Sequence, residues 1–185
     1  AGLLPERSLV PRRLADAMAY GVLGPGKRLR PFLVMESARL FDVPESRALR
    51  VGAALECVHA YSLAHDDLPA MDDDDLRRGR PTLHRAFDEA TAILAGDALL
   101  THAFALLGES YAGHPALATA LVRELGSAAG SRHLIGGQME DLLAEGKASA
   151  TADELEFIHL NKTAAMLEAS LVMGGLVGGL AEPHL

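Results

Sequence analysis

The segment GAALECVHAYSLAHDDLPAMDDDDLRRGR, residues 52–80, joins an apolar stretch to a dense run of acids that arginines follow at once. Its first part, up to Ala64, is rich in alanine and leucine and has the composition of a buried helix. Six aspartates then fall between positions 66 and 75. An acidic run usually belongs to a solvated tail. Its place at the end of an apolar helix instead predicts a partner of opposite charge.

The composition of the whole chain favours one helical domain that spans residues 1–185. This length is enough for a substantial core, and 49% of the residues are hydrophobic. Only 4% are aromatic and tryptophan is absent, so the core must be mostly aliphatic, which favours helices. The formal net charge of −8 and the few aromatic rings argue against nucleic acid as a partner.

The single cysteine, Cys57, lies within an apolar stretch and is interpreted as a small core residue. No disulfide can form within the chain, so a reducing cytoplasm is the expected location. The first residues lack the pattern of a secretory signal. The longest apolar stretch, residues 164–181, contains Glu168 and four glycines, so a buried helix is expected there and no transmembrane segment.

Periodicity and end signals predict an all-α fold, because no stretch alternates as a strand would. Pro11, Asp88 and Thr151 mark helix starts, and Glu154 completes a capping box with Thr151. The predicted elements are a helix from Pro11 to Leu23, a helix over Leu29–Phe41 with Leu29, Phe32, Leu33, Leu40 and Phe41 in its apolar stripe, a helix from Glu45 or Ser46 to Asp67, a loop over Leu68–Arg80, a short turn at Thr82–His84, and helices over Asp88–Leu107, Ala116–Glu145 and Thr151–Met173.

A polar stripe runs along the helix that ends in the acids. Glu56, His59 and Asp66 recur at steps of three or seven residues, so they share one face. Pro69 should end the helix and allow Asp72 to turn back towards Asp66. Carboxylate oxygens suit Mg²⁺, which usually keeps phosphates and waters as its other ligands. The alternative is a solvated acidic loop.

Arginines in the same loop point to phosphate. Planar guanidinium groups grip phosphate oxygens in pairs, and Arg77, Arg78 and Arg80 follow the acids directly. Carboxylates that bind a metal beside arginines that bind phosphate form a site for a metal–diphosphate complex. The alternative is that the arginines only neutralise the acids on the surface.

Two further segments have residue types that suit an anion. GPGKRLRP, residues 24–31, places Lys27, Arg28 and Arg30 at a glycine turn before a helix. HLNKTAAM, residues 159–166, brings Lys162 and Thr163 into an apolar helix. Each is weak alone, because basic turns and exposed lysines are common.

Together these segments resemble the trans-prenyl diphosphate synthases of the bacterial short-chain type, which make farnesyl and geranylgeranyl diphosphate. GKRLRP is similar to the isopentenyl diphosphate site of that family, and DDLPAMD to its first aspartate-rich motif. GGQMEDL and HLNKT are similar to two later helix motifs. The four motifs occur in the family's order, and the resemblance spans nearly the entire chain.

The resemblance implies an all-α bundle around a central cavity, a homodimer, and Mg²⁺-dependent head-to-tail condensation of an allylic diphosphate with isopentenyl diphosphate. It also implies the roles of individual residues. Asp66, Asp72, Arg77 and Lys162 are the expected catalytic residues, with Asp66 and Asp72 as the metal ligands. Isopentenyl diphosphate is expected to be bound by Lys27, Arg30, His59 and Arg78, and the allylic diphosphate by Arg77, Lys162 and Thr163, supported by Gln138 and Asp141.

Product length is expected to depend on the residues just before the first aspartates. Tyr61 and Ser62 should line the path of the growing chain. The ring of Tyr61, five residues before Asp66, resembles a stop for the C15 product, so farnesyl diphosphate is favoured over the C20 product.

The chain departs from the family in two places. A second aspartate-rich motif of the form DDxxD does not occur in the 185 residues, so about the last third of a usual synthase is missing. The sequence could be the ordered part of a longer protein, a fragment, or a truncated homologue that acts as a non-catalytic, interacting subunit. Arg132 and His133 also replace the small or apolar residues that usually precede GGQ.

A second enzymatic reading is a metal phosphohydrolase of the histidine–aspartate kind, suggested by His65–Asp66 and His59. It requires further histidines at metal distance, and it leaves GKRLRP and the arginines unexplained.

Overall fold

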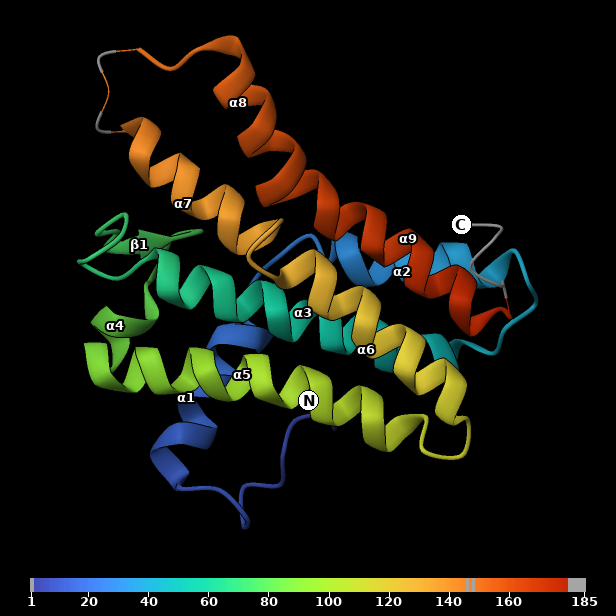
Figure 1. The fold of residues 1–185 in the computed structure, drawn as a ribbon. Coiled ribbons are helices and arrows are strands. Elements are labelled where there is room, and N and C mark those ends of the chain that lie inside the picture. The colour runs from blue at the N-terminus through green and yellow to red at the C-terminus, as the bar shows by residue number, and fades with distance from the viewer. Residues whose placement is uncertain (1, 146, 148, 180–185) are drawn as a thin grey trace. The chain divides into compact units, whose positions relative to one another are not determined.

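The computed structural model describes residues 2–145, 147 and 149–179, which fold into helices and one small hairpin (Figure 1). The helices are α1 (Arg12–Leu23), α2 (Leu29–Arg39), α3 (Glu45–Asp66), α4 (Leu83–Ala86), α5 (Glu89–Ser110), α6 (Pro115–Ala129), α7 (Leu134–Glu145), α8 (Ala152–Ile158), the π-helix η1 (His159–Ala164) and α9 (Ala165–Val177). The strands β1 (Leu76–Arg77) and β2 (Arg80–Pro81) pair antiparallel. The all-α prediction is confirmed, with this hairpin as the exception.

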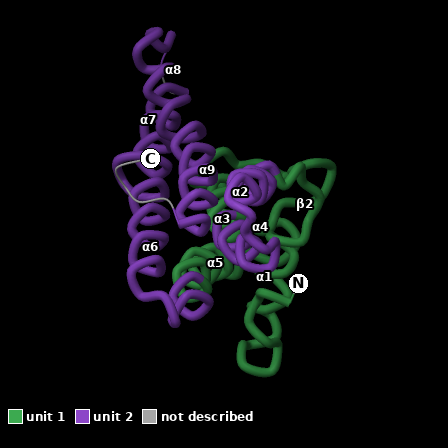
Figure 2. Tube along the Cα trace, turned by 90° about the vertical axis from the view of Figure 1, so that its right-hand side faces the viewer, with its two compact units in different colours: residues 1–28, 56–106 green, residues 29–55, 107–185 purple. Residues whose placement is uncertain are grey.

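The chain divides into two compact units (Figure 2). Unit 1 comprises residues 1–28 and 56–106, and unit 2 comprises residues 29–55 and 107–185. The helix α3 contributes its first half to unit 2 and its second half to unit 1. The single domain expected from the sequence stays a prediction.

Unit 1 contains α1, the end of α3, the hairpin, α4 and most of α5. Alanine and leucine side chains along α5 are buried, including Ala92, Ala95, Leu99 and Ala103. By length and composition α5 is the one helix among the described residues that could cross a membrane. A core helix of a globular protein has the same length and apolar composition, and it also buries an apolar face. Asp88 accepts a hydrogen bond from the Thr91 amide at 2.6 Å, as its predicted cap role requires.

Unit 2 is built around the contact of α2 with α9. The Ser37 hydroxyl donates to the Leu171 carbonyl at 2.6 Å. A Cβ atom at Gly174 would lie 2.6 Å from the Val34 carbonyl oxygen, so only glycine permits this approach. Small residues therefore determine how closely the two helices pack.

The predicted apolar stripe of α2 is wrong. Phe32, Leu29 and Leu40 are all about half or more exposed in the described chain, at 55%, 47% and 81%, whereas Val34 and Ala38 are buried. The side of α2 that meets α9 carries small residues, and Leu29, Phe32 and Leu40 point elsewhere. Phe41, beyond the end of α2, packs against Gly178 after α9. The helix also ends at Arg39, two residues before Phe41.

The predicted helix over Ala116–Glu145 is two helices, α6 and α7. The amide of Gly130 donates to the Ser127 carbonyl, and the amide of His133 donates to the Gly130 carbonyl at 3.1 Å. These bonds close a turn over residues 130–133, so the chain changes direction between α6 and α7. The glycines in this region and the unusual Arg132–His133 pair fall at or beside the break.

The predicted helix over Thr151–Met173 is likewise interrupted. The capping box of Thr151 and Glu154 is present, and α8 begins where it predicts. The backbone then widens into η1 before α9 continues to Val177. A π-helix has five-residue hydrogen bonding and is common at functional sites. The apolar stretch of residues 164–181 is mostly helical and buried as predicted, and Leu180 and Ala181 lie outside the described residues.

Candidate functional site

The acidic end of α3 turns back on itself. The helix stops at Asp66, and the amide of Asp72 donates to the Asp66 carbonyl at 2.9 Å. A second bond, from the Met71 amide to the Leu68 carbonyl at 2.8 Å, tightens the turn around Pro69. The backbones of two aspartates six positions apart are thereby brought together, as Pro69 predicted.

The donors at this turn fit a divalent cation that keeps some of its own ligands. Asp66 is buried and Asp72 is half-buried, so the two carboxylates differ from the exposed acids that follow them. No group of three or more acidic, histidine or cysteine side chains suited to a metal occurs in the described ranges. Two carboxylates with phosphate and water as further ligands are typical of Mg²⁺, whereas a site closed by protein ligands alone is not present there.

The first arginine of the loop is held by an aspartate that the sequence analysis did not single out. Arg77 Nε donates to Asp67 Oδ1 at 2.6 Å, and Arg77 Nη2 lies 3.4 Å from Asp74 Oδ2. Asp67 is buried, and burial raises the pKa of its carboxyl, against the lowering effect of the Arg77 guanidinium. The Asp67 side chain therefore fixes the direction in which Arg77 leaves the hairpin.

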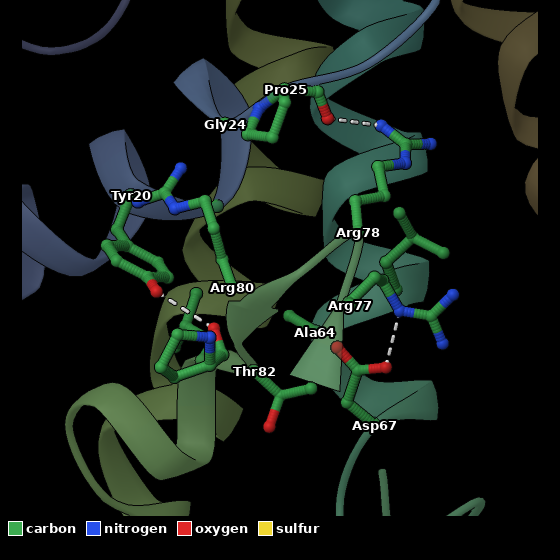
Figure 3. Close-up of a pocket in the computed structure, with 13 residues that line it drawn as sticks. Tyr20, Gly24, Pro25, Ala64, Asp67, Arg77, Arg78, Arg80 and Thr82 are labelled. Atoms are coloured by element: carbon green, nitrogen blue, oxygen red, sulfur yellow. Dashed lines mark hydrogen bonds and ion pairs between the residues drawn. The ribbon is translucent and has the colours of Figure 1, made fainter. Parts of the chain in front are cut away.

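A pocket of about 80 Å³ lies between the end of α1 and the hairpin (Figure 3). Arg78 Nη1 donates to the Pro25 carbonyl at 2.6 Å. The Arg80 guanidinium lies over the Tyr20 ring, with its carbon 4.2 Å from the ring centroid, and the Tyr20 hydroxyl donates to the Pro81 carbonyl at 2.8 Å. The hairpin thus grips the glycine turn that carries Lys27 from two sides.

Arg78, which lines this pocket, and Arg28, which follows the glycine turn, both have left-handed backbone. Arg28 has φ 52° and Arg78 has φ 54°, a region that favours glycine. Arg28 is also tied by its side chain to Glu56 of α3 and to the Gly24 carbonyl. Such strain persists only where surrounding contacts impose it, and it gathers at functional sites.

The remaining residues predicted for isopentenyl diphosphate fall in both units. Lys27 is exposed at the turn, and His59 is half-buried on α3; both belong to unit 1. Arg30 is half-buried near the start of α2 and belongs to unit 2. Within unit 1, the structure therefore brings the turn that carries Lys27 close to the loop of Arg78. Arg30 belongs to unit 2.

A second group of predicted residues lies within unit 2. Lys162 Nζ donates to Asp141 Oδ2 at 2.5 Å, which links η1 to α7. A Cβ atom at Gly137 would lie 2.8 Å from Lys162 Cα, so the glycine of GGQ allows the two elements to touch. Gln138 is half-buried one turn before Asp141, and Thr163 is exposed. The two later helix motifs thus meet each other directly.

The residues predicted to limit product length lie on α3. Tyr61 and Ser62 are both half-buried. The Ser62 hydroxyl donates to the His59 carbonyl within the helix at 2.9 Å. The Tyr61 ring lies edge-on against the imidazole of His65, with the ring centroids 5.1 Å apart.

Two partners in the site, Asp67 and Tyr20, were not singled out from the sequence. Asp67 could have been found as the second acid of the DDLPAMD motif, whereas Glu56 was identified in the polar stripe of α3 without its partner Arg28. Tyr20 gave no signal, since its contact with Arg80 depends on the hairpin fold. The histidine–aspartate phosphohydrolase reading has no support in the described residues, because no cluster of histidines and acids suited to a metal is present there.

Comparison with known proteins identifies the family. Residues 11–185 match the family Polyprenyl synthetase, so the chain belongs to that family. It is 47% identical over 176 residues to the farnesyl diphosphate synthase of Geobacillus stearothermophilus. This alignment covers 94% of the present chain and 59% of that protein. It is 46% identical over 176 residues to a chloroplastic geranylgeranyl pyrophosphate synthase of Catharanthus roseus, with 95% and 49% covered.

A solved structure supports the same assignment. The structure described as an FPP/GFPP synthase from Zymomonas mobilis aligns with a TM-score of 0.90 at 44% identity, over 98% of this chain and 66% of that one. The chain spans about half to three-fifths of the length of the two curated relatives named above. The helical fold and membership of the Polyprenyl synthetase family are therefore established for the matched part.

Proposed function

We propose that the protein condenses isopentenyl diphosphate with an allylic diphosphate, head to tail, to give a short-chain prenyl diphosphate. The observation that carries this proposal is the pair of charged clusters in unit 1. A buried and a half-buried aspartate meet at the turn after α3, and three arginines of the following hairpin surround the adjacent pocket. Acids for a metal beside cations for phosphate suit a diphosphate substrate better than any uncharged one.

Each cluster has a distinct part in the proposed reaction. Arg77 and Lys162 contact the allylic diphosphate and stabilise the negative charge that grows on it as the allylic C–O bond breaks. Arg78 and Lys27 hold isopentenyl diphosphate, whose double bond forms the new C–C bond with the allylic cation. Formation of this bond leaves a tertiary carbocation on the condensed product. The cation loses a proton from a neighbouring carbon to form the new double bond, and the released diphosphate is the proposed proton acceptor.

Asp66 and Asp72 are the proposed Mg²⁺ ligands. When bound, the metal supplies positive charge that neutralises the diphosphate leaving group. The aliphatic composition of the helices suits the other requirement, which is exclusion of water from the allylic cation. His59, Arg30, Thr163, Gln138 and Asp141 complete the proposed contacts as expected from the motifs.

The proposed product is C15, and C20 is the alternative. The half-buried ring of Tyr61 supports the shorter product, because it is a large side chain five positions before the proposed metal ligand. The relatives named above include both farnesyl and geranylgeranyl synthases. A homodimer and a cytoplasmic location belong to the same proposal.

A condensation assay tests the proposal. The protein is incubated with Mg²⁺, isopentenyl diphosphate and geranyl diphosphate, and the products are sized by mass spectrometry. A C15 or C20 diphosphate is expected. Asp66→Asn should lower the rate on the order of 100-fold or more, because charge on the leaving group is no longer compensated.

The matched control is Asp73→Asn, which removes one charge from the same acidic run at an exposed position. It should leave the rate near that of the wild type. Absence of any prenyl diphosphate from the wild-type protein would overturn the proposed function. Equal losses in the two variants would show that the acidic run acts through its total charge, and would sink the assignment of Asp66 as a metal ligand.

A further inference from the structure

The ring of Tyr61 is held in place by its neighbour on α3. Tyr61 and His65 are one helical turn apart, and their rings meet edge to face at an interplanar angle of 81°. This arrangement is one that aromatic pairs prefer. Rotation of the tyrosine ring towards α5 is therefore opposed by the imidazole.

The imidazole is in turn fixed on α5. His65 Nε2 lies 3.0 Å from the Ile93 carbonyl oxygen and 3.8 Å from Asp97 Oδ1. A Cβ atom at Gly96 would lie 2.5 Å from His65 Cδ2, so the ring occupies the space that the glycine leaves open. His65 is thus enclosed between a carbonyl, a carboxylate and a glycine of a single helical turn.

Tyr61 is linked to the same turn of α5 through His65. Burial raises the pKa of the Tyr61 hydroxyl, and the charge of Asp97 raises it further. The three contacts all lie within unit 1. Tyr61, His65 and the turn from Ile93 to Asp97 therefore form one packed group.

We propose that His65, seated on Gly96, is a specificity-determining residue that sets product length by holding the ring of Tyr61 in position. The inference rests on the proposed function. The growing prenyl product gains five carbons in each condensation. The Tyr61 ring can block the next condensation only if it keeps its position when the product presses against it. His65 is a positioning residue here and acts through Tyr61.

Two variants from different helices test the inference by product length. His65→Ala removes the ring that backs Tyr61, and Gly96→Ala displaces the imidazole without changing α3. Both should raise the ratio of C20 to C15 product about two- to tenfold, since an edge-to-face pair contributes a free energy of that order. The ratio is measured by mass spectrometry in a reaction with excess isopentenyl diphosphate.

The matched control is Gly108→Ala, which adds the same methyl group to the same helix where nothing lies within 4 Å of the new atom. It should keep the wild-type ratio. Tyr61→Ala and the double variant Tyr61→Ala/His65→Ala should give equal ratios, because His65 has no separate effect once the ring is gone.

The outcomes separate this inference from the proposed function. A wild-type protein that makes C15, with unchanged product ratios in His65→Ala and Gly96→Ala, leaves the function standing and overturns the role of His65. Further lengthening in the double variant relative to Tyr61→Ala would show that His65 acts directly, and overturns its positioning role. A wild-type protein that makes no prenyl diphosphate overturns both proposals.

Discussion

Among single residues, Cys57 has a side chain whose chemistry is strongly altered by burial. Its side chain is 3% exposed, and burial raises the pKa of its thiol to about 12, with a smaller contribution from the charge of Glu56. A thiol in this state is neither a good nucleophile nor a metal ligand at neutral pH. The interpretation of Cys57 as a core residue is confirmed.

Cys57 should therefore report unfolding. At pH 8 in native buffer, its alkylation by iodoacetamide should be slower by orders of magnitude than in the denatured chain, because the thiolate is required for reaction and is rare in the folded state. The mass increase after timed quenching measures this. The chain has one cysteine, so no other thiol contributes. Rapid labelling of the native protein would contradict the buried position.

The same thiol makes stability fall at high pH. Its folded pKa lies above the value of 9.0 of an exposed thiol, so ionisation favours the unfolded chain. The contribution of the neutral thiol is complete below about pH 9 and is lost as the pH rises towards 12. Cys57→Ala should weaken this dependence in denaturant titrations.

Single residues also show which contacts of the candidate site could be predicted from the sequence. Pro69 predicted that Asp72 would return to Asp66, because the rule for residues before proline is local. The pairing of Arg77 with Asp67 was not predicted, since six aspartates compete for three arginines and only the folded hairpin decides among them. Local stereochemistry could be read from the sequence, whereas the choice of charge partner could not.

At the scale of elements, the hairpin of β1 and β2 acts as a clamp on the end of α1. It holds the glycine turn through Arg78 on one side and through Arg80 and Tyr20 on the other. A four-residue ladder this short is not stable alone. Its geometry therefore depends on these contacts with α1, and the turn before Lys27 depends on the hairpin.

Removing one side of this clamp should affect one substrate more than the other. Arg80→Ala loses the contact with the Tyr20 ring, so the KM for isopentenyl diphosphate should rise about two- to fivefold, the range of an exposed cation–π pair. The KM for the allylic diphosphate should stay unchanged. Steady-state kinetics with each substrate varied in turn measures both values.

Arg85→Ala is the matched control, because Arg85 pairs with Asp75 on the same loop but does not line the pocket. Equal increases in both KM values for Arg80→Ala would indicate general loosening of the loop and contradict the specific role of the clamp.

The elements also separate what sequence patterns can and cannot predict. Helix starts were predicted well, because Pro11, Asp88 and Thr151 act on adjacent backbone groups. The breaks between α6 and α7 and at η1 were missed, since each depends on contacts across the fold. Gly137 of α7 packs on Lys162 of η1, a contact between residues 25 positions apart that no local pattern predicts. The stripe of α2 was wrong because small side chains, rather than large ones, form its contact with α9.

For the whole molecule, family membership is established and activity is proposed. The charged residues of the proposed site fall in both units, and the chain spans about half to three-fifths of the two curated relatives named above. The net charge of −8 is a property of all 185 residues together, and it does not depend on which residues form the proposed site. Acidic residues outnumber basic ones, 25 to 17, so local arginine clusters lie in a negative field.

That field should prevent binding to nucleic acid. At about 0.15 M salt, protein at roughly 10 µM should not retard labelled double-stranded DNA in a gel, because phosphate contacts provide nearly all of non-specific affinity and the protein repels them. The assay is repeated with Mg²⁺, which could bridge the two negative partners. Retardation that weakens as salt is raised would contradict the prediction.

The left-handed backbone at Arg28 and Arg78 sets a limit on how this protein could be made hardier. Glycine adopts that conformation without steric strain, but each arginine side chain makes contacts that glycine would lose. Arg28 pairs with the buried Glu56, and Arg78 donates to the Pro25 carbonyl. A glycine at either position would therefore exchange backbone strain for lost contacts, and at Arg78 it would also remove a guanidinium group proposed to bind isopentenyl diphosphate. A screen for heat tolerance alone would not detect that loss, and only a screen that also demands turnover would preserve Arg78.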